Sequence, residues 1–280
     1  MTVPFSRGRF RLSAHLGYLF GELPLAGRFA AARRAGFGAI EIPDPYGFSA
    51  SEFRSLCEEN NLEVAQIAVP NGASAATRKG LAALPGREAE FEDALMRSIA
   101  YAKAANCRLI HPMSGIKAPF GPLPRWEVYL SNLAKACSAA ADEGLCVIIE
   151  AISAFGTRNY FLNSVWRACD AIDLVKAPNL FLSLDTYHAA AMGVHLPSFM
   201  AKNSARIGHV QVADWPSRSE PGSGHINFGE FFSALSDIGY RGYVGLEYLP
   251  SQPSTGGFDW TGRFEASLMP LGMESAAKSA

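Results

Sequence analysis

The sequence has no long apolar run and no excess of charge of either sign. Of its 280 residues, 25 are Lys or Arg and 26 are Asp or Glu, which gives a formal net charge of −1. No basic block of five or more residues occurs, so neither nucleic acid nor an anionic membrane is expected as a partner. Apolar stretches fall below the roughly 18 residues of a membrane span, and residues 1–12 lack the apolar core of a signal peptide. These absences predict a cytoplasmic protein.

Cysteine is scarce, and the five cysteines are scattered without a CxxC pair. An odd number at irregular spacing favours buried thiols in a reducing compartment over a disulfide framework. There is no Walker-type phosphate loop, no GxGxxG after the first predicted strand, no GxSxG and no HExxH. Nucleotide-binding proteins, serine hydrolases and zincin peptidases are therefore disfavoured.

Apolar residues are abundant, and they recur in short, regularly spaced runs. Hydrophobic residues make up 49% of the chain and charged residues 18%, which suits a large core. Eight runs rich in β-branched or aromatic residues are predicted strands, over residues 9–16, 37–43, 64–69, 108–112, 146–152, 180–186, 207–212 and 243–248. Helical patterns alternate with them, over residues 27–35, 50–60, 87–105, 125–143, 163–175 and 228–238.

This alternation predicts an α/β fold with a parallel sheet and right-handed crossovers. Eight repeats in about 250 residues fit a closed (β/α)₈ TIM barrel better than an open doubly wound sheet. No composition shift or linker divides the chain, so residues 1–280 are predicted to form one domain. A closing helix is expected over residues 258–268, and the tail, 273–280, is expected to be frayed.

Polar residues stand at the carboxyl ends of four successive predicted strands. These residues are Glu150, Asp185, Gln211 and Glu247, each within an apolar run. Barrel enzymes carry their active sites at this end, so the four side chains are expected at one mouth. Singly, each could cap a helix or pair with an arginine, but three carboxylates together would repel one another without a cation. The all-oxygen donor set favours Mg²⁺ or Mn²⁺, and Zn²⁺ is less suited.

Other polar residues are predicted near the same mouth. His188 follows Asp185 by three residues, His111 ends the fourth strand, and Glu41 ends the second. We interpret these three as candidate substrate contacts. His15 ends the first strand and is a weaker candidate. For each imidazole the alternative is a satisfied core histidine.

The loop after the seventh strand, ADWPSRSEPGSGHINF, is rich in Gly and Pro and could cross the barrel mouth. Its Arg218 offers two donors suited to a carboxylate or phosphate, and the alternative is an exposed arginine paired with Glu220. His209 is expected to be a core histidine. His195 and His225 lie in connections and are expected at the surface.

Glu150 and Glu247 could serve as paired general bases on either side of a bound substrate. A divalent ion that chelates a carbonyl and the adjacent hydroxyl acidifies the C–H bond between them and stabilises the resulting enediolate. If one carboxylate removes a proton and the other returns one to the neighbouring carbon, the reaction is aldose–ketose isomerisation. Return to the opposite face of the same carbon gives epimerisation.

Several stretches resemble hydroxypyruvate isomerase and its relatives in the xylose isomerase-like barrel superfamily. They are RLSAHLGYLFGELPL, GLAALPGREAEF, DTYHAA, RIGHVQVADWPSRSEPGSGHINF and GYVGLEYLP, which span nearly the whole chain. The resemblance implies a metal site and two proton-transfer glutamates drawn from the four strand-end residues. It also implies that His188 and Arg218 face the substrate, as in similar sugar epimerases. The implied reaction interconverts hydroxypyruvate and tartronate semialdehyde, or a longer acid such as a 2-oxo-tetronate.

The chain departs from the family pattern after the fifth strand. The family glutamate is usually followed by Pro-Ile-Asn and a basic residue, whereas here Glu150 is followed by Ala151-Ile152-Ser153. The loop after the third strand also differs, and His225 replaces a more usual Glu. Proton-transfer chemistry is retained in this interpretation, but the substrate is not determined.

Other functions remain open at this point. A ketose 3-epimerase, a lyase that dehydrates a polyol or hydroxy-ketone, and a non-catalytic metabolite-binding barrel could all use the same residues. A DNA-repair endonuclease would need more metal-binding histidines and a basic surface, and the net charge is −1. The expected partner is a small-molecule substrate, and association of copies into a homo-oligomer is left open.

Overall fold

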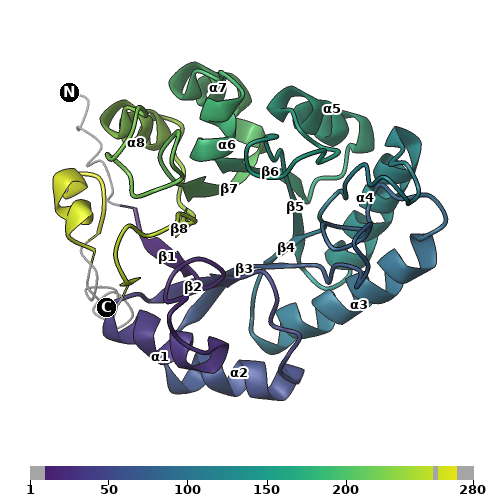
Figure 1. Ribbon diagram of the computed structural model, residues 1–280, viewed down its shortest axis with the longest axis horizontal. Helices are drawn as coiled ribbons and strands as arrows, with labels where there is room; N and C mark the ends of the chain where they lie inside the picture. Colours follow the sequence, from purple (N-terminus) through teal and green to yellow (C-terminus); the bar gives the residue numbers. More distant parts are fainter. Residues whose placement is uncertain (1–9, 255–257, 270–280) are drawn as a thin grey trace, which may run out of the picture.

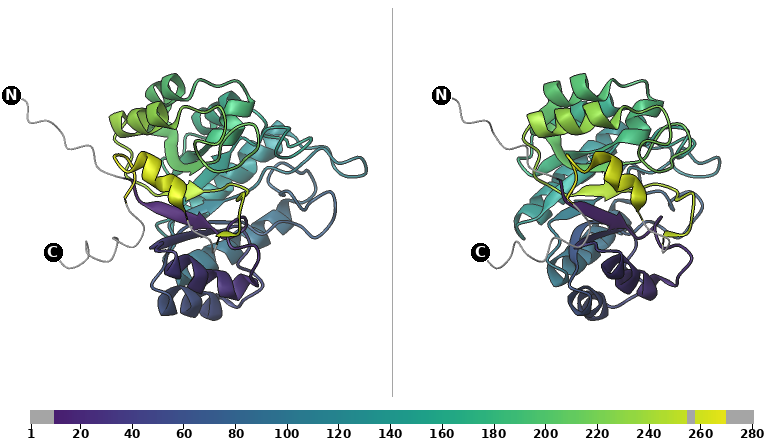
Figure 2. Two further views of the ribbon diagram at one scale, coloured as in Figure 1. Left: turned by 60° about the vertical axis from the view of Figure 1, so that its left-hand side comes forward. Right: turned by 90° about the vertical axis from the view of Figure 1, so that its left-hand side faces the viewer.

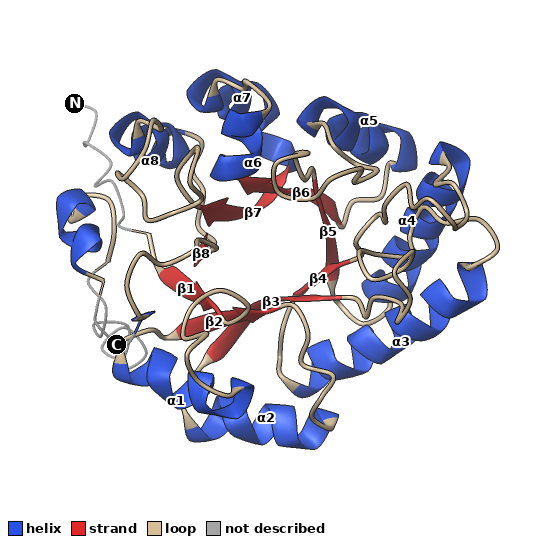
Figure 3. Cartoon of the chain, in the orientation of Figure 1, coloured by secondary structure: helices blue, strands red, loops and turns tan. Residues whose placement is uncertain are grey.

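The computed structural model describes residues 10–254 and 258–269. Eight parallel strands close into one barrel in sequence order, and β8 pairs again with β1. Helices surround the barrel on its outer side (Figures 1 and 3). The predicted (β/α)₈ TIM barrel is confirmed.

All eight strands lie at the predicted positions; six have tighter bounds, β3 is shifted by one residue, and β7 has the predicted bounds. They are β1 Leu12–His15, β2 Ala39–Ile42, β3 Glu63–Ala68, β4 Leu109–His111, β5 Cys146–Glu150, β6 Leu180–Asp185, β7 Ile207–Val212 and β8 Val244–Leu246. Most of their residues are buried, because side chains fill the barrel on one face and helices cover the other. Glu150 and Asp185 end their strands, whereas Glu247 begins the loop after β8.

The helices confirm the predicted pattern between most strands. They are α1 Leu25–Arg34, α2 Ala50–Glu59, α3 Glu88–Ala104, α4 Trp126–Ala141, α5 Val165–Val175, α6 Thr186–Ala191, α7 Leu196–Asn203 and α8 Phe228–Asp237. No helix was predicted at α6 or α7, because six and eight residues are too few to establish a helical period. No helix of the described ranges is both long and apolar enough to cross a membrane.

The closing segment differs from the expected helix. It forms a 3₁₀ helix, η3, over Asp259–Phe264, and a second short 3₁₀ turn, η1, covers Ser204–Arg206. The tail predicted to be frayed lies outside the described residues. The chain connections after β3 and β4 extend far beyond the strands at the carboxyl end of the barrel (Figure 2).

Side-chain caps fix where several helices begin. Ser49 and Glu52 form a reciprocal capping box at α2, and Asn227 caps α8. At α6 the cap is Asp185 itself, whose Oδ1 accepts a 3.1 Å bond from the backbone N–H of His188. The start of α6 therefore holds two candidate site residues in a fixed relation.

Gly245 on β8 makes room inside the barrel for the carboxylate of Glu41. A β-carbon at position 245 would lie 1.9 Å from Glu41 Oε1. No side chain can occupy that space without displacing the buried carboxylate.

We expect Gly245→Ala to destabilise the protein by about 1–3 kcal/mol, because the new methyl group overpacks the barrel interior. Urea unfolding measures the change. Gly27→Ala is the matched control: its β-carbon would meet Leu23 at 3.8 Å, within helix α1. There, alanine should be neutral or slightly stabilising. Equal stability of Gly245→Ala and the parent protein would contradict this packing.

Candidate active site

Three predicted residues meet where β5 and β6 end. Glu150, Asp185 and His188 each present one potential ligand atom, and these atoms all lie within 4.8 Å of one another. All three residues are buried. Glu150 Oε1 and Asp185 Oδ2 have no hydrogen-bond partner in the described part of the chain. Buried carboxylate oxygens that lack a donor are a setting that a divalent cation would satisfy, so the residues fit a metal ion.

Arg218 joins Glu247 to this cluster. Its guanidinium Nη2 lies 2.6 Å from Glu247 Oε1 and 3.7 Å from Asp185 Oδ2. The rings of Tyr18 and Tyr187 lie 4.7 and 5.1 Å from the guanidinium carbon, at cation–π distance. Arg218 thus supplies one positive charge to a group of three buried carboxylates.

The predicted alternative for Arg218, an ion pair with Glu220, is wrong. Glu220 Oε1 instead accepts hydrogen bonds from the backbone N–H and the hydroxyl of Ser251, at 2.7 and 3.0 Å.

The electrostatics of the site reflect this excess of negative charge. Burial raises the pKa of Glu247 to about 8, with Arg218 opposing the shift and Asp185 adding to it. Burial, together with the neighbouring Glu247 and Asp185 carboxylates, raises the pKa of Glu150 well above its usual value. A single guanidinium does not fully compensate three carboxylates, which is a second reason why a bound cation suits the site.

The ring of His188 is oriented by the loop after β5. Its Nδ1 lies 3.1 Å from Ser153 Oγ and accepts a 3.4 Å bond from the Ser153 backbone N–H. Since a backbone N–H can only donate, the ring proton is on Nε2, which lies 3.7 Å from Glu150 Oε1. Burial lowers the pKa of His188 to about 4, so it is a neutral donor near pH 7.

Gly156 in the same loop lies against the His188 ring. A β-carbon there would approach His188 Cε1 to 2.1 Å. We therefore expect Gly156→Ala to displace the imidazole and to lower kcat/KM by about tenfold or more, as misplaced catalytic groups do. Gly47→Ala is the control, because a β-carbon at Gly47 meets nothing within 4 Å. Steady-state kinetics on both variants make the comparison, and unchanged kcat/KM in Gly156→Ala would contradict the proposed role of the ring position.

Gln211 comes from β7, next to Asp185 in register. Its Nε2 donates a 2.8 Å hydrogen bond to Glu41 Oε2, and its Oε1 accepts a 3.2 Å bond from Ser183 Oγ. The amide is thus held by protein contacts on both sides, unlike the unpartnered oxygens of Glu150 and Asp185.

The structure does not place Glu41 at the barrel mouth. Its side chain is 0% exposed, and its carboxylate turns into the barrel to contact Ser13, Gln66, His209 and Gln211. The substrate contact of Glu41 stays a prediction, because its carboxylate is occupied by these four side chains.

His111 and His15 are both buried near the mouth. His111 Nε2 has no hydrogen-bond partner among the described residues, and burial lowers the pKa of His111 to about 4. His15 Nε2 lies 3.9 Å from Glu247 Oε2, and burial likewise lowers its pKa to about 4. Both are neutral imidazoles near pH 7, and the substrate contact of His111 stays a prediction.

The remaining histidines lie where the sequence predicts them. His209 is buried with Nε2 3.0 Å from Glu41 Oε1, as a satisfied core histidine. His195 and His225 are exposed.

Comparison with known proteins assigns the fold to a family. Residues 29–264 match the family described as xylose isomerase-like TIM barrel. The chain belongs to this family. It is 34% identical to hydroxypyruvate isomerase of Escherichia coli, over 89% of this chain and 97% of that protein. It is 36% identical to 2-oxo-tetronate isomerase of Cupriavidus necator, over 89% and 96%. These relatives support the prediction that the chain is an isomerase.

A solved member of similar shape is a crystal structure described as AP endonuclease, family 2, from Brucella melitensis. Its TM-score is 0.86 at 35% identity, and the match covers 91% of this chain and 99% of that one. The xylose isomerase-like barrel is therefore shared over nearly the full length of both chains.

Several residues of this xylose isomerase-like site escaped sequence reasoning. Tyr18 and Tyr187 flank Arg218, and Ser153 orients His188. Asp214 accepts backbone N–H bonds from Gly222, Gly224 and Ile226 and so folds the loop that carries Arg218. The only available signal was their adjacency to predicted residues, since Tyr18 and Tyr187 stand in the HLGYLF and DTYH stretches.

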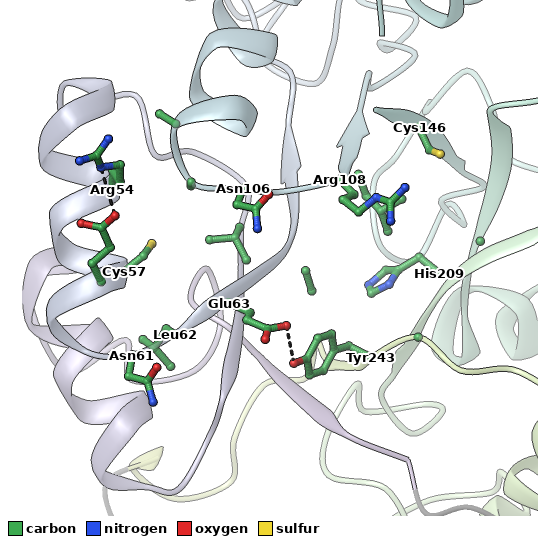
Figure 4. A pocket seen from close by; sticks show the side chains of 18 of the residues that line it. Arg54, Cys57, Asn61, Leu62, Glu63, Asn106, Arg108, Cys146, His209 and Tyr243 are labelled. Carbon is green, nitrogen blue, oxygen red and sulfur yellow. Dashed lines mark hydrogen bonds and ion pairs between the residues drawn. The ribbon is translucent and has the colours of Figure 1, made fainter. Parts of the chain in front are cut away.

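A cavity of about 870 Å³ lies at the opposite, amino-terminal end of the barrel. Figure 4 shows His209, Arg108, Glu63 and Tyr243 around it. None of the four strand-end candidates lines this cavity. The candidate site and this cavity are therefore at different ends of the barrel.

Proposed function

We propose that the protein interconverts an aldose-type and a ketose-type hydroxy-oxo acid, such as hydroxypyruvate and tartronate semialdehyde or a 2-oxo-tetronate and its isomer. The observation that carries this proposal is a cluster of three buried carboxylates. Asp185 and Glu247 contact the Arg218 guanidinium, Glu150 lies within 4.8 Å of Asp185, and one oxygen each of Glu150 and Asp185 has no hydrogen-bond partner among the described residues. The names of the relatives support the substrate class.

A divalent cation, Mg²⁺ or Mn²⁺, is the cofactor proposed for this site. Glu150, Asp185, Gln211 and Glu247 would hold it. His188 lies beside Glu150 and Asp185, but with its proton on Nε2 it acts as a donor and not as a ligand. When bound, such an ion supplies Lewis acidity toward the substrate carbonyl. Zn²⁺ suits the oxygen-rich donor set less well.

The two glutamates perform the proton transfer. One carboxylate removes a proton from the hydroxyl-bearing carbon, and the electron pair of the broken C–H bond forms the C=C bond of an enediolate. The other glutamate delivers a proton to the former carbonyl carbon. The hydroxyl proton moves between the two oxygens, so the product is an isomer of the substrate and no atom is lost.

The substrate is proposed to be a small anion. Arg218 is the cation at the site, and the neutral His188 presents its Nε2–H toward Glu150, where a substrate oxygen could accept it. His111 is proposed as a further contact. The cytoplasmic location and the absence of a nucleic-acid partner stay predictions from the sequence, as does the single domain.

Replacing either proton-transfer glutamate should abolish the reaction. We expect Glu150→Gln and Glu247→Gln to lose incorporation of deuterium from D₂O into hydroxypyruvate, because an amide cannot act as a base. Proton NMR follows the exchange, and circular dichroism checks the fold. Glu127→Gln, on the exposed side of α4, is the matched control and should exchange normally. Near-full turnover of either site variant would rule out the two-glutamate mechanism.

Removal of the Arg218 guanidinium should weaken binding of anionic substrates. We expect Arg218→Ala to raise KM for hydroxypyruvate by about tenfold or more, since a charge-assisted hydrogen bond contributes roughly 1.5–3 kcal/mol. A neutral ketose of similar size serves as the comparison substrate and should show a smaller change in KM. An equal change in KM for both substrates would contradict a contact between Arg218 and the carboxylate of the substrate.

The alternatives give different products in the same measurement. An epimerase would exchange the proton but return the inverted sugar, and a lyase would release water and form an unsaturated product. A metabolite-binding barrel would bind the metal and substrate without exchange.

A further inference from the structure

Glu41 contacts Gln211, a proposed metal ligand, through the amide nitrogen, which cannot bind a metal. Gln211 offers a metal only its amide oxygen, because its NH₂ group has no free electron pair for coordination. The two ends of an amide have nearly the same shape, so packing alone does not select which end faces the site.

The carboxylate of Glu41 is fixed as an acceptor by its surroundings. Oε1 receives the Ser13 hydroxyl at 2.6 Å and lies 3.0 Å from His209 Nε2, while Oε2 receives the amide nitrogens of Gln66 at 3.2 Å and Gln211 at 2.8 Å. The Ser13 hydroxyl and the His209 ring could each donate or accept at Oε1, but the two NH₂ groups that contact Oε2 can only donate. Oε2, the oxygen that faces Gln211, is therefore the accepting oxygen of this carboxyl group.

We infer that Glu41 is a positioning residue that sets the orientation of the Gln211 amide, so that the oxygen of Gln211 and not its NH₂ group is presented to a bound cation. The accepting oxygen Oε2, at 2.8 Å, holds the amide nitrogen of Gln211 on its side. Ser183, on the other side, cannot make this selection, because a hydroxyl can donate or accept. The effect on metal binding rests on the proposed function, because Gln211 is a metal ligand only in that proposal.

Gly245 provides independent support for a dedicated carboxylate position. A β-carbon at position 245 would come within 1.9 Å of Glu41 Oε1. The barrel interior thus reserves space for this group, in addition to supplying its donors.

The first test needs no metal. In ¹⁵N-labelled protein, the side-chain NH₂ signals of Gln211, identified by their loss in Gln211→Glu, should exchange slowly with solvent. In Glu41→Gln they should exchange faster, because the new amide no longer demands a donor. Equal exchange rates in the two proteins would overturn the inference.

The second test measures Mn²⁺ binding to the metal-free protein by isothermal titration calorimetry. We expect Glu41→Gln to weaken Mn²⁺ binding by about 10–100-fold, the usual effect of losing a contact behind a ligand. Gln66→Met is the matched control: it removes another hydrogen bond to the same carboxylate, and the Gln66 amide oxygen has no partner among the described residues. Its Mn²⁺ affinity should be unchanged, so an equal loss in both variants would reduce Glu41 to a structural role.

An exchange of the two side chains keeps the test decisive if Glu41→Gln folds poorly. In the double variant Glu41→Gln/Gln211→Glu the amide donates to the carboxylate, and an oxygen again faces the site. Mn²⁺ affinity should return at least to the parent level, and failure to return in a folded protein would contradict the inference. If the parent protein shows slow Gln211 exchange but binds no Mn²⁺, the proposed metal dependence is wrong while the orientation by Glu41 stands.

Discussion

Burial of like charge inside the barrel is the constraint that organises this molecule, and each carboxylate is compensated in a different way. Glu41 receives hydrogen-bond contacts from four side chains and is complete without a ligand. Glu247 is paired with Arg218, and Asp185 uses one oxygen to cap α6. Glu150 Oε1 and Asp185 Oδ2 receive no hydrogen bond within the described residues. The difference between complete and incomplete carboxylates separates the supporting network from the reactive end of the site.

The loops at the carboxyl end of the barrel position the side chains that lie around these carboxylates. The loop after β5 departs from the family pattern, yet its Ser153 and Gly156 are fitted to the His188 ring. The loop after β7 is organised by Asp214, which receives three backbone N–H groups and so supports Arg218. Ser153 and Gly156 therefore fix the position of the His188 ring in this chain.

Strand and helix order was predictable from the sequence because apolar runs and helical patterns alternate along the whole chain. The same alternation placed Glu150 and Asp185 at the ends of their strands. It did not give the direction of the Glu41 side chain, which is as long as that of Glu150 but turns toward internal donors. The tyrosines around Arg218 escaped prediction because the contact joins β1, β6 and β7 connections that are distant in sequence. The sequence therefore predicted the fold, but not the directions of side chains or the contacts between residues distant in the chain.

The measurement that most directly tests this account is proton NMR of hydroxypyruvate in D₂O with purified protein, first stripped of metal and then supplied with Mg²⁺ or Mn²⁺. The account predicts deuterium uptake at the carbon next to the carbonyl, together with formation of tartronate semialdehyde, only when the ion is present. Four-carbon oxo-acids measured in parallel identify the preferred chain length. Absence of exchange on all of these substrates, with the ion shown to be bound, would contradict enediolate chemistry at this site.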